Sequence, residues 1–310
     1  MTIFLHFYPR RVAQAVPQIF LLLFLIFTTA ATAEQAVPQQ ASPALWKLAR
    51  ENGNGHVYLF GSFHVLPREL RWFTGEVRKA FEEVDELVFE TSMTTEAQSE
   101  TALLVMSRSM LPAGYSLKGL LEEEDYARAV QHAAALGLEE RQVSRLQPWY
   151  LALTLSVQSI MSYGLDPNSG VEKIMQALAE ARGLTISGLE TPQEQIMALS
   201  DHPLEVQTAM LVDTLDKLSD FETYISAYIE AWASGKDEVI AARMIEDMKK
   251  YPQMYQAVLV QRNKNWIPKL TYLINSGKSV MVVVGAAHLV GQDGLIRMLE
   301  EKGYHFEKVQ

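Results

Sequence analysis

The chain has 310 residues and a formal net charge of −10 at neutral pH, with 27 basic and 37 acidic side chains. This acidic balance argues against a nucleic-acid-binding surface, which needs Lys and Arg to neutralise phosphates. The chain has no cysteine, which excludes disulfides, thiolate catalysis and cysteine-ligated metal sites.

The first 33 residues are typical of a signal peptide. Arg10 and Arg11 precede the apolar run at residues 19–27, and small residues precede Glu34. This run is about half of the roughly 20 residues that a membrane-spanning helix needs, so cleavage after Ala33 is favoured over a retained anchor. Sec export is favoured over twin-arginine export, which the two arginines also suggest. We therefore expect a periplasmic or secreted protein without a membrane anchor.

Residues 34–43 are polar and contain two prolines without periodicity, which is typical of a linker. Residues 44–310 are then long enough for one large domain. The runs LWKLA and HVYLFGSFH, separated by the Asn- and Gly-rich ENGNG, predict a β-hairpin. A helix is expected at about 75–84, and ELVFET at 86–91 predicts a buried strand.

The middle of the chain, from about 94 to 276, has apolar residues at helical spacing. TISGLE at 185–190 interrupts it as a short strand. The run SVMVVVGAAH predicts another strand, and a helix and a final strand close the chain. The expected fold class is α/β (α+β), with a mixed β-sheet core built from the two ends of the sequence and a large, mostly helical middle.

Two of the predicted strands run into the same pattern, Gly-x-x-His, at Gly61 and Gly285. Glycine lets the backbone turn sharply or approach a ligand closely. The other two strands carry a glutamate at their ends. In open α/β sheets ligands bind at the carboxyl edge of the strands, so four side chains are expected to meet there: His64, Glu90, Glu190 and His288.

Two imidazoles with one or two carboxylates suit a divalent transition metal that keeps open positions for water and substrate. We predict that His64, Glu90 and His288 bind the ion and act in catalysis, with Glu190 as a further ligand. Zinc is one suitable ion. The alternatives are that the histidines cap strand ends by bonding to the backbone, and that Glu190 begins the next helix.

Arg262 and Asn263 open the helix that precedes the last long strand. The arginine is a further catalytic candidate, because it could orient a carboxylate or stabilise an oxyanion. The alternative is an exposed helix start. Tyr224, Tyr228 and Trp232 recur every four residues, which favours core packing over a substrate surface.

Several segments resemble successive motifs of the TraB/GumN family, which includes the Tiki proteins. The resemblance runs in order over about residues 45–309 and is carried by YLFGSFHVLP with VFET, GLETPQEQ, YIEAWASGKDEVI, QRNKNW and VVVGAAHLVGQDGLIRMLEEKGY. It implies a fold with two related α/β halves, akin to the erythromycin esterase and ChaN-like proteins. His64 and His288 match the motif histidines, Glu90 and Glu190 the motif glutamates, and Arg262 with Asn263 the Arg-Asn pair.

Tiki proteins are metal-dependent proteases that use manganese or cobalt, so the resemblance implies a metal-dependent hydrolase. Unlike them, this chain is expected to have no C-terminal membrane anchor. We expect a periplasmic hydrolase, one form of which is a peptidase, acting on a peptide or small-molecule substrate. The alternative is a non-catalytic ligand-binding protein linked to envelope polysaccharide or peptide signalling.

Overall fold

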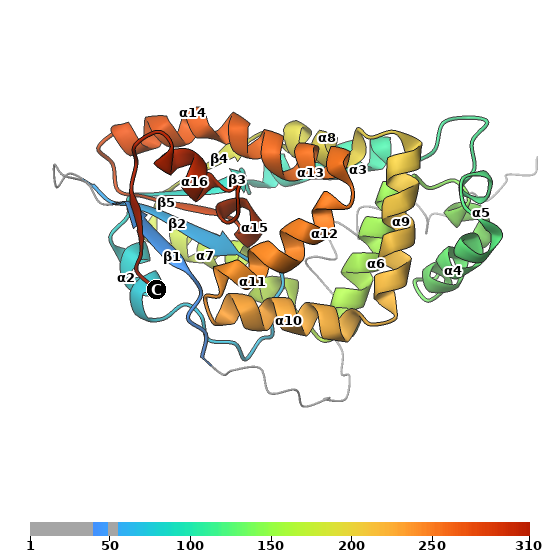
Figure 1. The fold of residues 1–310 in the computed structure, drawn as a ribbon, viewed down its shortest axis with the longest axis horizontal. Helices are drawn as coiled ribbons and strands as arrows, with labels where there is room; N and C mark the ends of the chain where they lie inside the picture. The colour runs from blue at the N-terminus through green and yellow to red at the C-terminus, as the bar shows by residue number, and fades with distance from the viewer. Residues whose placement is uncertain (1–39, 49–54) are drawn as a thin grey trace, which may run out of the picture.

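The computed structural model describes residues 40–48 and 55–310 (Figure 1). The predicted signal peptide, its cleavage site and the turn of the predicted hairpin lie outside the described residues. The end of the predicted linker packs on the fold, since the backbone N–H groups of Ala41 and Ser42 donate to the carbonyls of Arg71 and Ala233. Within the described residues no helix is long and apolar enough to cross a membrane.

A mixed six-stranded sheet forms the centre of the α/β fold, with strand order β4-β3-β5-β2-β1-β6. The four strands β4, β3, β5 and β2 are parallel to their neighbours, whereas β1 is antiparallel to both β2 and β6. The predicted hairpin strands are confirmed as β1 and β2. The strands are β1 Leu45–Leu48, β2 Val57–Ser62, β3 Glu86–Thr91, β4 Thr185–Glu190, β5 Val280–Gly285 and β6 Phe306–Lys308.

Strands β2 and β5 are apolar along their length because helices cover both faces of the sheet. Leu59, Phe60, Val282 and Val283 are fully buried, as expected for parallel strands at the centre of an α/β fold. The crossovers from β2 to β3 and from β4 to β5 run in opposite directions, so their helices lie on opposite faces. Helices α2 (Gly75–Glu82) and α7 (Val171–Arg182) cover one face, and α14 (Arg262–Asn275) and α16 (Leu295–Glu300) the other (Figure 1).

The middle of the chain is helical, as predicted, and part of it forms a second hydrophobic cluster away from the sheet, around Leu117, Leu151 and Leu211. Its helices lie beyond the carboxyl ends of the strands, at the right of Figure 1. Two π-helical segments, Ala241–Ile245 (η3) and Gln256–Gln261 (η4), were not predicted. The remaining helices are α3 Thr95–Arg108, α4 Glu123–Ala134, α5 Glu140–Val143, α6 Pro148–Ser162, α8 Pro192–Ser200, α9 Leu204–Leu218, α10 Phe221–Ala233, α11 Asp237–Ile240, α12 Glu246–Lys249, α13 Pro252–Tyr255 and α15 Ala286–Leu289, with 3-10 turns η1 Leu117–Gly119 and η2 Pro167–Ser169.

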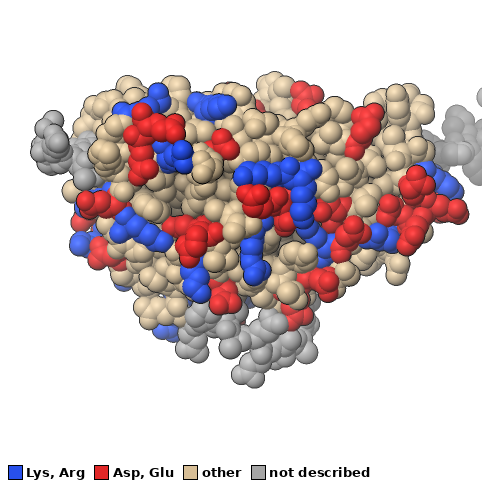
Figure 2. Space-filling model, in the orientation of Figure 1, with Lys and Arg blue, Asp and Glu red and all other residues tan. Residues whose placement is uncertain are grey.

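Charged side chains of both signs are interspersed over the face of the molecule in Figure 2. Many are paired on helix surfaces, such as Arg78 with Glu82 and Lys249 with Glu246. Exposed pairs of this kind contribute little to stability.

Candidate functional site

The carboxyl ends of the four parallel strands lie side by side. In the β2–β5 ladder Ser62 is opposite Gly285, and in the β3–β4 ladder Thr91 is opposite Glu190. This register brings the four predicted side chains to one edge of the sheet. His64 follows β2, Glu90 is the penultimate residue of β3, Glu190 ends β4, and His288 lies in α15 directly after β5.

Neither motif glycine has a positive φ, so the backbone conformation does not require glycine there. The space around each of them does. A Cβ on Gly61 would lie 3.1 Å from both the Cα and the Cβ of Ala286, tighter than ordinary contact. A Cβ on Gly285 would lie 3.3 Å from Glu90 Oε1. The backbone N–H of Gly285 donates to that same oxygen at 2.7 Å. The second motif glycine therefore lets β5 approach the Glu90 carboxylate.

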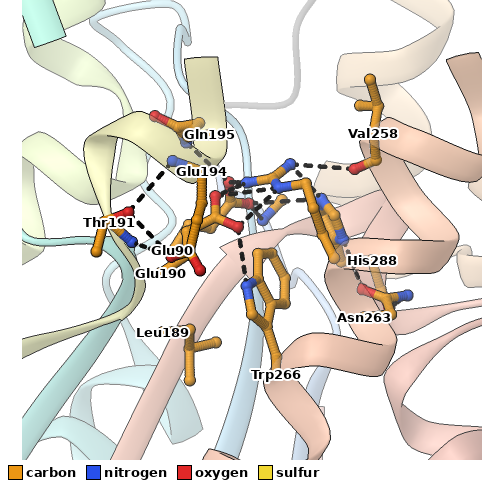
Figure 3. A network of polar contacts seen from close by, with 12 residues as sticks. Glu90, Leu189, Glu190, Thr191, Glu194, Gln195, Val258, Asn263, Trp266 and His288 are labelled. Carbon is orange, nitrogen blue, oxygen red and sulfur yellow. Dashed lines mark hydrogen bonds and ion pairs between the residues drawn. The ribbon is translucent and has the colours of Figure 1, made fainter. Parts of the chain in front are cut away.

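Arg262 is the hub of the buried part of the site, with 8% of its surface exposed. Its Nε donates to both carboxylate oxygens of Glu190 at 3.0 and 3.1 Å. Its Nη2 donates to Glu190 Oε1 at 2.5 Å and to Glu90 Oε2 at 2.6 Å. Figure 3 shows Glu90, Glu190 and His288 pointing toward one another, with the indole of Trp266 beside them. The indole N–H of Trp266 donates to Glu190 Oε2 at 3.0 Å.

His288 has a defined tautomer, which its neighbours determine. Its Nε2 lies 3.1 Å from Arg262 Nη1, and a guanidinium can only donate. Nε2 is therefore the acceptor, so the proton is on Nδ1 and is donated to Asn263 Oδ1 at 2.6 Å. Asn263 in turn donates to the carbonyls of His288 and Asp293. The ring also packs on Trp266, with centroids 4.5 Å apart.

Burial and the arginine together decide the charges of this cluster. Burial lowers the pKa of His288 to about 3, so the ring is neutral at pH 7. Burial acts to raise the pKa of Glu90, but Arg262 and the Gly285 N–H hold it well below its usual range. Burial also raises the pKa of Glu190, although Arg262 opposes the rise.

His64 lies at the exposed mouth of the site, with 71% of its side chain accessible. Its Nδ1 is 2.9 Å from Glu172 Oε1, and the hydroxyl of Ser62 donates to the same oxygen. The Glu172 carboxylate raises the pKa of His64 to about 9. Within the described chain no other contact engages the His64 ring nitrogens, so Nε2 is open to a ligand.

Glu172 reaches His64 because α7 begins against the backbone that follows β2. The backbone N–H of Val171 donates to the carbonyl of Phe63 at 3.0 Å. A Cβ on Gly170 would lie 2.0 Å from the carbonyl oxygen of His64, so only glycine fits there. This contact places the first turn of α7, and with it Glu172, beside the imidazole.

Three residues of the site were missed by sequence reasoning: Ser62, Glu172 and Trp266. Ser62 and Trp266 stand in the motif segments SFH and RNKNW, so their position beside the motif residues was an available signal. Glu172 is in the first turn of an amphipathic helix, a common place for a solvated carboxylate. No local pattern distinguishes it from such a residue.

Two alternatives left open by the sequence are resolved. Thr191 is the N-cap of α8 and forms a capping box with Glu194, so Glu190 does not cap that helix. Arg262 is buried and bonded to two carboxylates, so it is not an exposed helix start. A cavity of about 390 Å³, lined in part by Glu190, Arg262 and Trp266, adjoins this buried cluster.

The donors do not fit a metal ion as they are arranged. The guanidinium of Arg262 stands between Glu90, Glu190 and His288, where a cation would lie, and His64 bonds to Glu172 instead. Across residues 40–48 and 55–310, no group of three or more His, Asp or Glu side chains is placed to hold a metal ion. The metal-ligand roles of His64, Glu90, Glu190 and His288 stay predictions.

Comparison with known proteins agrees with the resemblance seen in the motifs. No curated protein matches the sequence. The model of the TraB/PrgY/gumN family matches residues 44–308, a segment that contains the whole sheet, both Gly-x-x-His turns and the buried arginine cluster. The chain therefore belongs to the TraB/PrgY/gumN family.

Proposed function

We propose that this protein is a hydrolase in which His64 is the general base. The observation that carries the proposal is the contact between His64 Nδ1 and Glu172 on a side chain that is 71% accessible, with no partner at the opposite ring nitrogen among the described residues. A carboxylate that orients an imidazole and stabilises its protonated form is a recurring arrangement in acyl-transfer enzymes. The raised pKa of His64 is the expected effect of this partner.

The reaction needs only groups at this edge of the sheet. Neutral His64 accepts a proton from water on Nε2 as the water oxygen bonds to a substrate carbonyl carbon. Glu172 stabilises the imidazolium that forms. The same proton passes to the leaving oxygen or nitrogen when its bond to carbon breaks, which returns His64 to the neutral state.

The buried cluster acts in positioning. The Nε, Nη1 and Nη2 atoms of Arg262 all donate to protein acceptors, and the Glu90 carboxylate holds the end of β5 through the Gly285 N–H. His288 and Asn263 tie the segment after β5 to α14. These contacts fix the ends of β3, β4 and β5 at the site, the kind of support that a catalytic site requires.

The substrate proposed is a peptide or a small-molecule ester or amide, and the proposed location is the periplasm. The family resemblance supports hydrolysis and implies manganese or cobalt. Arg262 already pairs with both buried carboxylates, and none of the steps above uses a metal. Metal dependence is tested together with activity.

The experiment compares wild-type protein, His64→Gln and a control, His56→Gln, on p-nitrophenyl esters and on a peptide library. Each assay is run with EDTA and with Mn²⁺, Co²⁺ or Zn²⁺. Loss of a general base lowers the rate about 10²- to 10⁴-fold, so His64→Gln should lose at least about 100-fold while His56→Gln keeps wild-type activity. Retained activity in His64→Gln would refute the base assignment. A wild-type protein that hydrolyses nothing would favour the ligand-binding alternative.

A further inference from the structure

A second cavity, of about 330 Å³, lies among the helices beyond the strand ends. Its walls come from α6, α9, α10, α12 and α13 and from the two π-helical segments. The lining is mainly apolar and rich in methionine and tyrosine. We call it the methionine–tyrosine pocket; its defining residues are Met210, Tyr224, Tyr228, Met244, Met248 and Met254.

The three aromatic residues that recur every four positions in the sequence are divided between this pocket and the core. Trp232 is buried and donates its indole N–H to the carbonyl of Gly61 at 2.8 Å, as core packing predicts. Tyr224 and Tyr228 instead line the pocket, and 39% of the Tyr224 surface is exposed. Methionine side chains are flexible and polarisable, which lets a pocket adapt to apolar groups of different shape.

The charged groups on the pocket wall, Asp213, Asp247 and Lys217, are all paired. Lys217 Nζ lies 2.7 Å from Asp213 and 3.6 Å from Asp247, and Lys250 Nζ lies 2.8 Å from Asp247. The Tyr228 hydroxyl donates to Asp247 at 3.3 Å. Each aspartate of the wall therefore has a lysine partner, although Lys250 itself lies outside the lining, and the wall offers no unpaired charge. The complementary ligand is uncharged.

The pocket and the candidate site are neighbours of the same helical segment, η4. Val258 lines the pocket, and its carbonyl accepts from Arg262 Nη1 at 3.2 Å. The same π-helical segment thus forms a pocket wall and leads directly into Arg262. Met244 is carried by the other π-helical segment, η3. Single π-helical turns inside helices occur frequently at functional sites.

We propose that the methionine–tyrosine pocket binds an uncharged apolar group, a short alkyl chain or a single ring system, of the molecule that is hydrolysed at the sheet edge. The identification of the ligand as the hydrolysed molecule rests on the proposed function. It is motivated by the hydrogen bond between the Val258 carbonyl, on the pocket wall, and Arg262 of the candidate site. The volume is within the range of small-molecule sites, about 300 to 1,000 Å³.

The binding test uses N-phenyl-1-naphthylamine, an uncharged probe that fluoresces in apolar surroundings. Wild-type protein should bind it saturably at a single site. Met244→Trp and Met254→Trp fill the pocket from different walls and should each weaken binding at least about tenfold. Met106→Trp on α3, where Met106 is 40% exposed and outside the pocket, is the control. The proposal is overturned if wild-type protein shows no saturable binding. It is also overturned if a pocket variant that keeps the wild-type circular dichroism spectrum binds the probe as wild type does.

The substrate test uses p-nitrophenyl hexanoate and acetate as competitors of the probe in His64→Gln protein, so that no hydrolysis is needed. Hexanoate should displace the probe at least about tenfold better than acetate. In active protein, kcat/KM for hexanoate relative to acetate should fall in Met244→Trp. An unchanged ratio would indicate that the pocket binds a separate lipid-like ligand, and it would overturn the proposal that the pocket binds part of the substrate. If neither esters nor peptides are hydrolysed, the proposed function fails, while probe displacement still decides the pocket.

Discussion

Replacing Arg262 with methionine keeps a side chain of similar length and removes the charge that two buried carboxylates share. Glu90 loses its contact at 2.6 Å, and Glu190 loses contacts to both of its oxygens. Removing one partner of a buried ion pair costs about 3–5 kcal/mol, because an uncompensated charge stays behind. Glu190, whose pKa burial already raises, can take up a proton and so limits the loss. We therefore expect the variant to lose about 3–5 kcal/mol of unfolding free energy.

The matched segment, residues 44–308, contains about 265 residues. An unfolding entropy of about 2.1 cal/mol/K per residue gives about 0.56 kcal/mol per kelvin near the midpoint. The expected loss is then about 5–9 °C in Tm. Thermal unfolding followed by circular dichroism at pH 7 measures it. Arg297→Met is the control, because Arg297 is half exposed and its pair with Glu301 lies on a helix surface; its loss should stay below about 0.5 kcal/mol.

The pH dependence of the difference in unfolding free energy between wild type and Arg262→Met tests whether the lost charge pairing causes it. Glu90 has a lowered pKa in the folded protein, so its contribution to stability is present above its unfolded pKa and is lost as the pH falls through the folded value. In the variant the carboxylates take up protons more readily. The gap between wild type and variant should therefore narrow at acidic pH. A loss below about 1 kcal/mol at pH 7, or a gap that does not change with pH, would show that the arginine does not stabilise the ionised carboxylates of this cluster.

Three further outcomes are expected. If neutral His64 is the base, kcat/KM should rise with pH toward about 9, and Glu172→Gln should move this rise to lower pH, since the carboxylate raises the pKa of His64. An activity profile that does not move in Glu172→Gln contradicts the pairing. The pair also adds stability to the folded protein below pH 6.5, and this stability is lost as pH rises through about 9. Dialysis against EDTA should leave the Tm of the wild-type protein unchanged, because Arg262 already supplies the buried positive charge; a fall of several degrees that Mn²⁺ or Co²⁺ reverses would instead establish a metal site. Mass spectrometry of protein recovered from the periplasm should give an N-terminus at Glu34, whereas full-length chain in the inner membrane would make residues 19–27 an anchor.

The strands were predicted well because their signals are local. An apolar run bounded by turn residues is sufficient to identify β2, β3 and β5, and β4 is identified as a short break, TISGLE, between helical segments. The strand-end positions of Glu90 and Glu190 follow from these segments. The convergence of these ends follows from a general property of parallel sheets. The sequence therefore predicted the edge of the sheet at which the candidate site lies.

The internal arrangement of the site depends on contacts between distant segments. Arg262 and Glu90 are 172 residues apart in the chain, and His64 and Glu172 come from different elements. The same two histidines and two glutamates suit either a metal ion or a guanidinium among them, so their presence in the sequence does not distinguish the two cases. Only the position of α14 shows that an arginine stands there, and only the start of α7 shows that His64 has its own carboxylate.

The place of β5 in the sheet has a consequence for how the chain folds. This strand, the fifth in sequence, lies between β2 and β3, and it joins residues far apart, as in the bond between His56 and Ser279 across 223 positions. Until residues 280–285 are available, β2 and β3 have no central partner and expose their edges. Such long-range closure is slow, and open edges invite aggregation. A chain that loses its last 31 residues should therefore fail to form the sheet at all, and chaperones that shield strand edges should raise the yield of the complete protein.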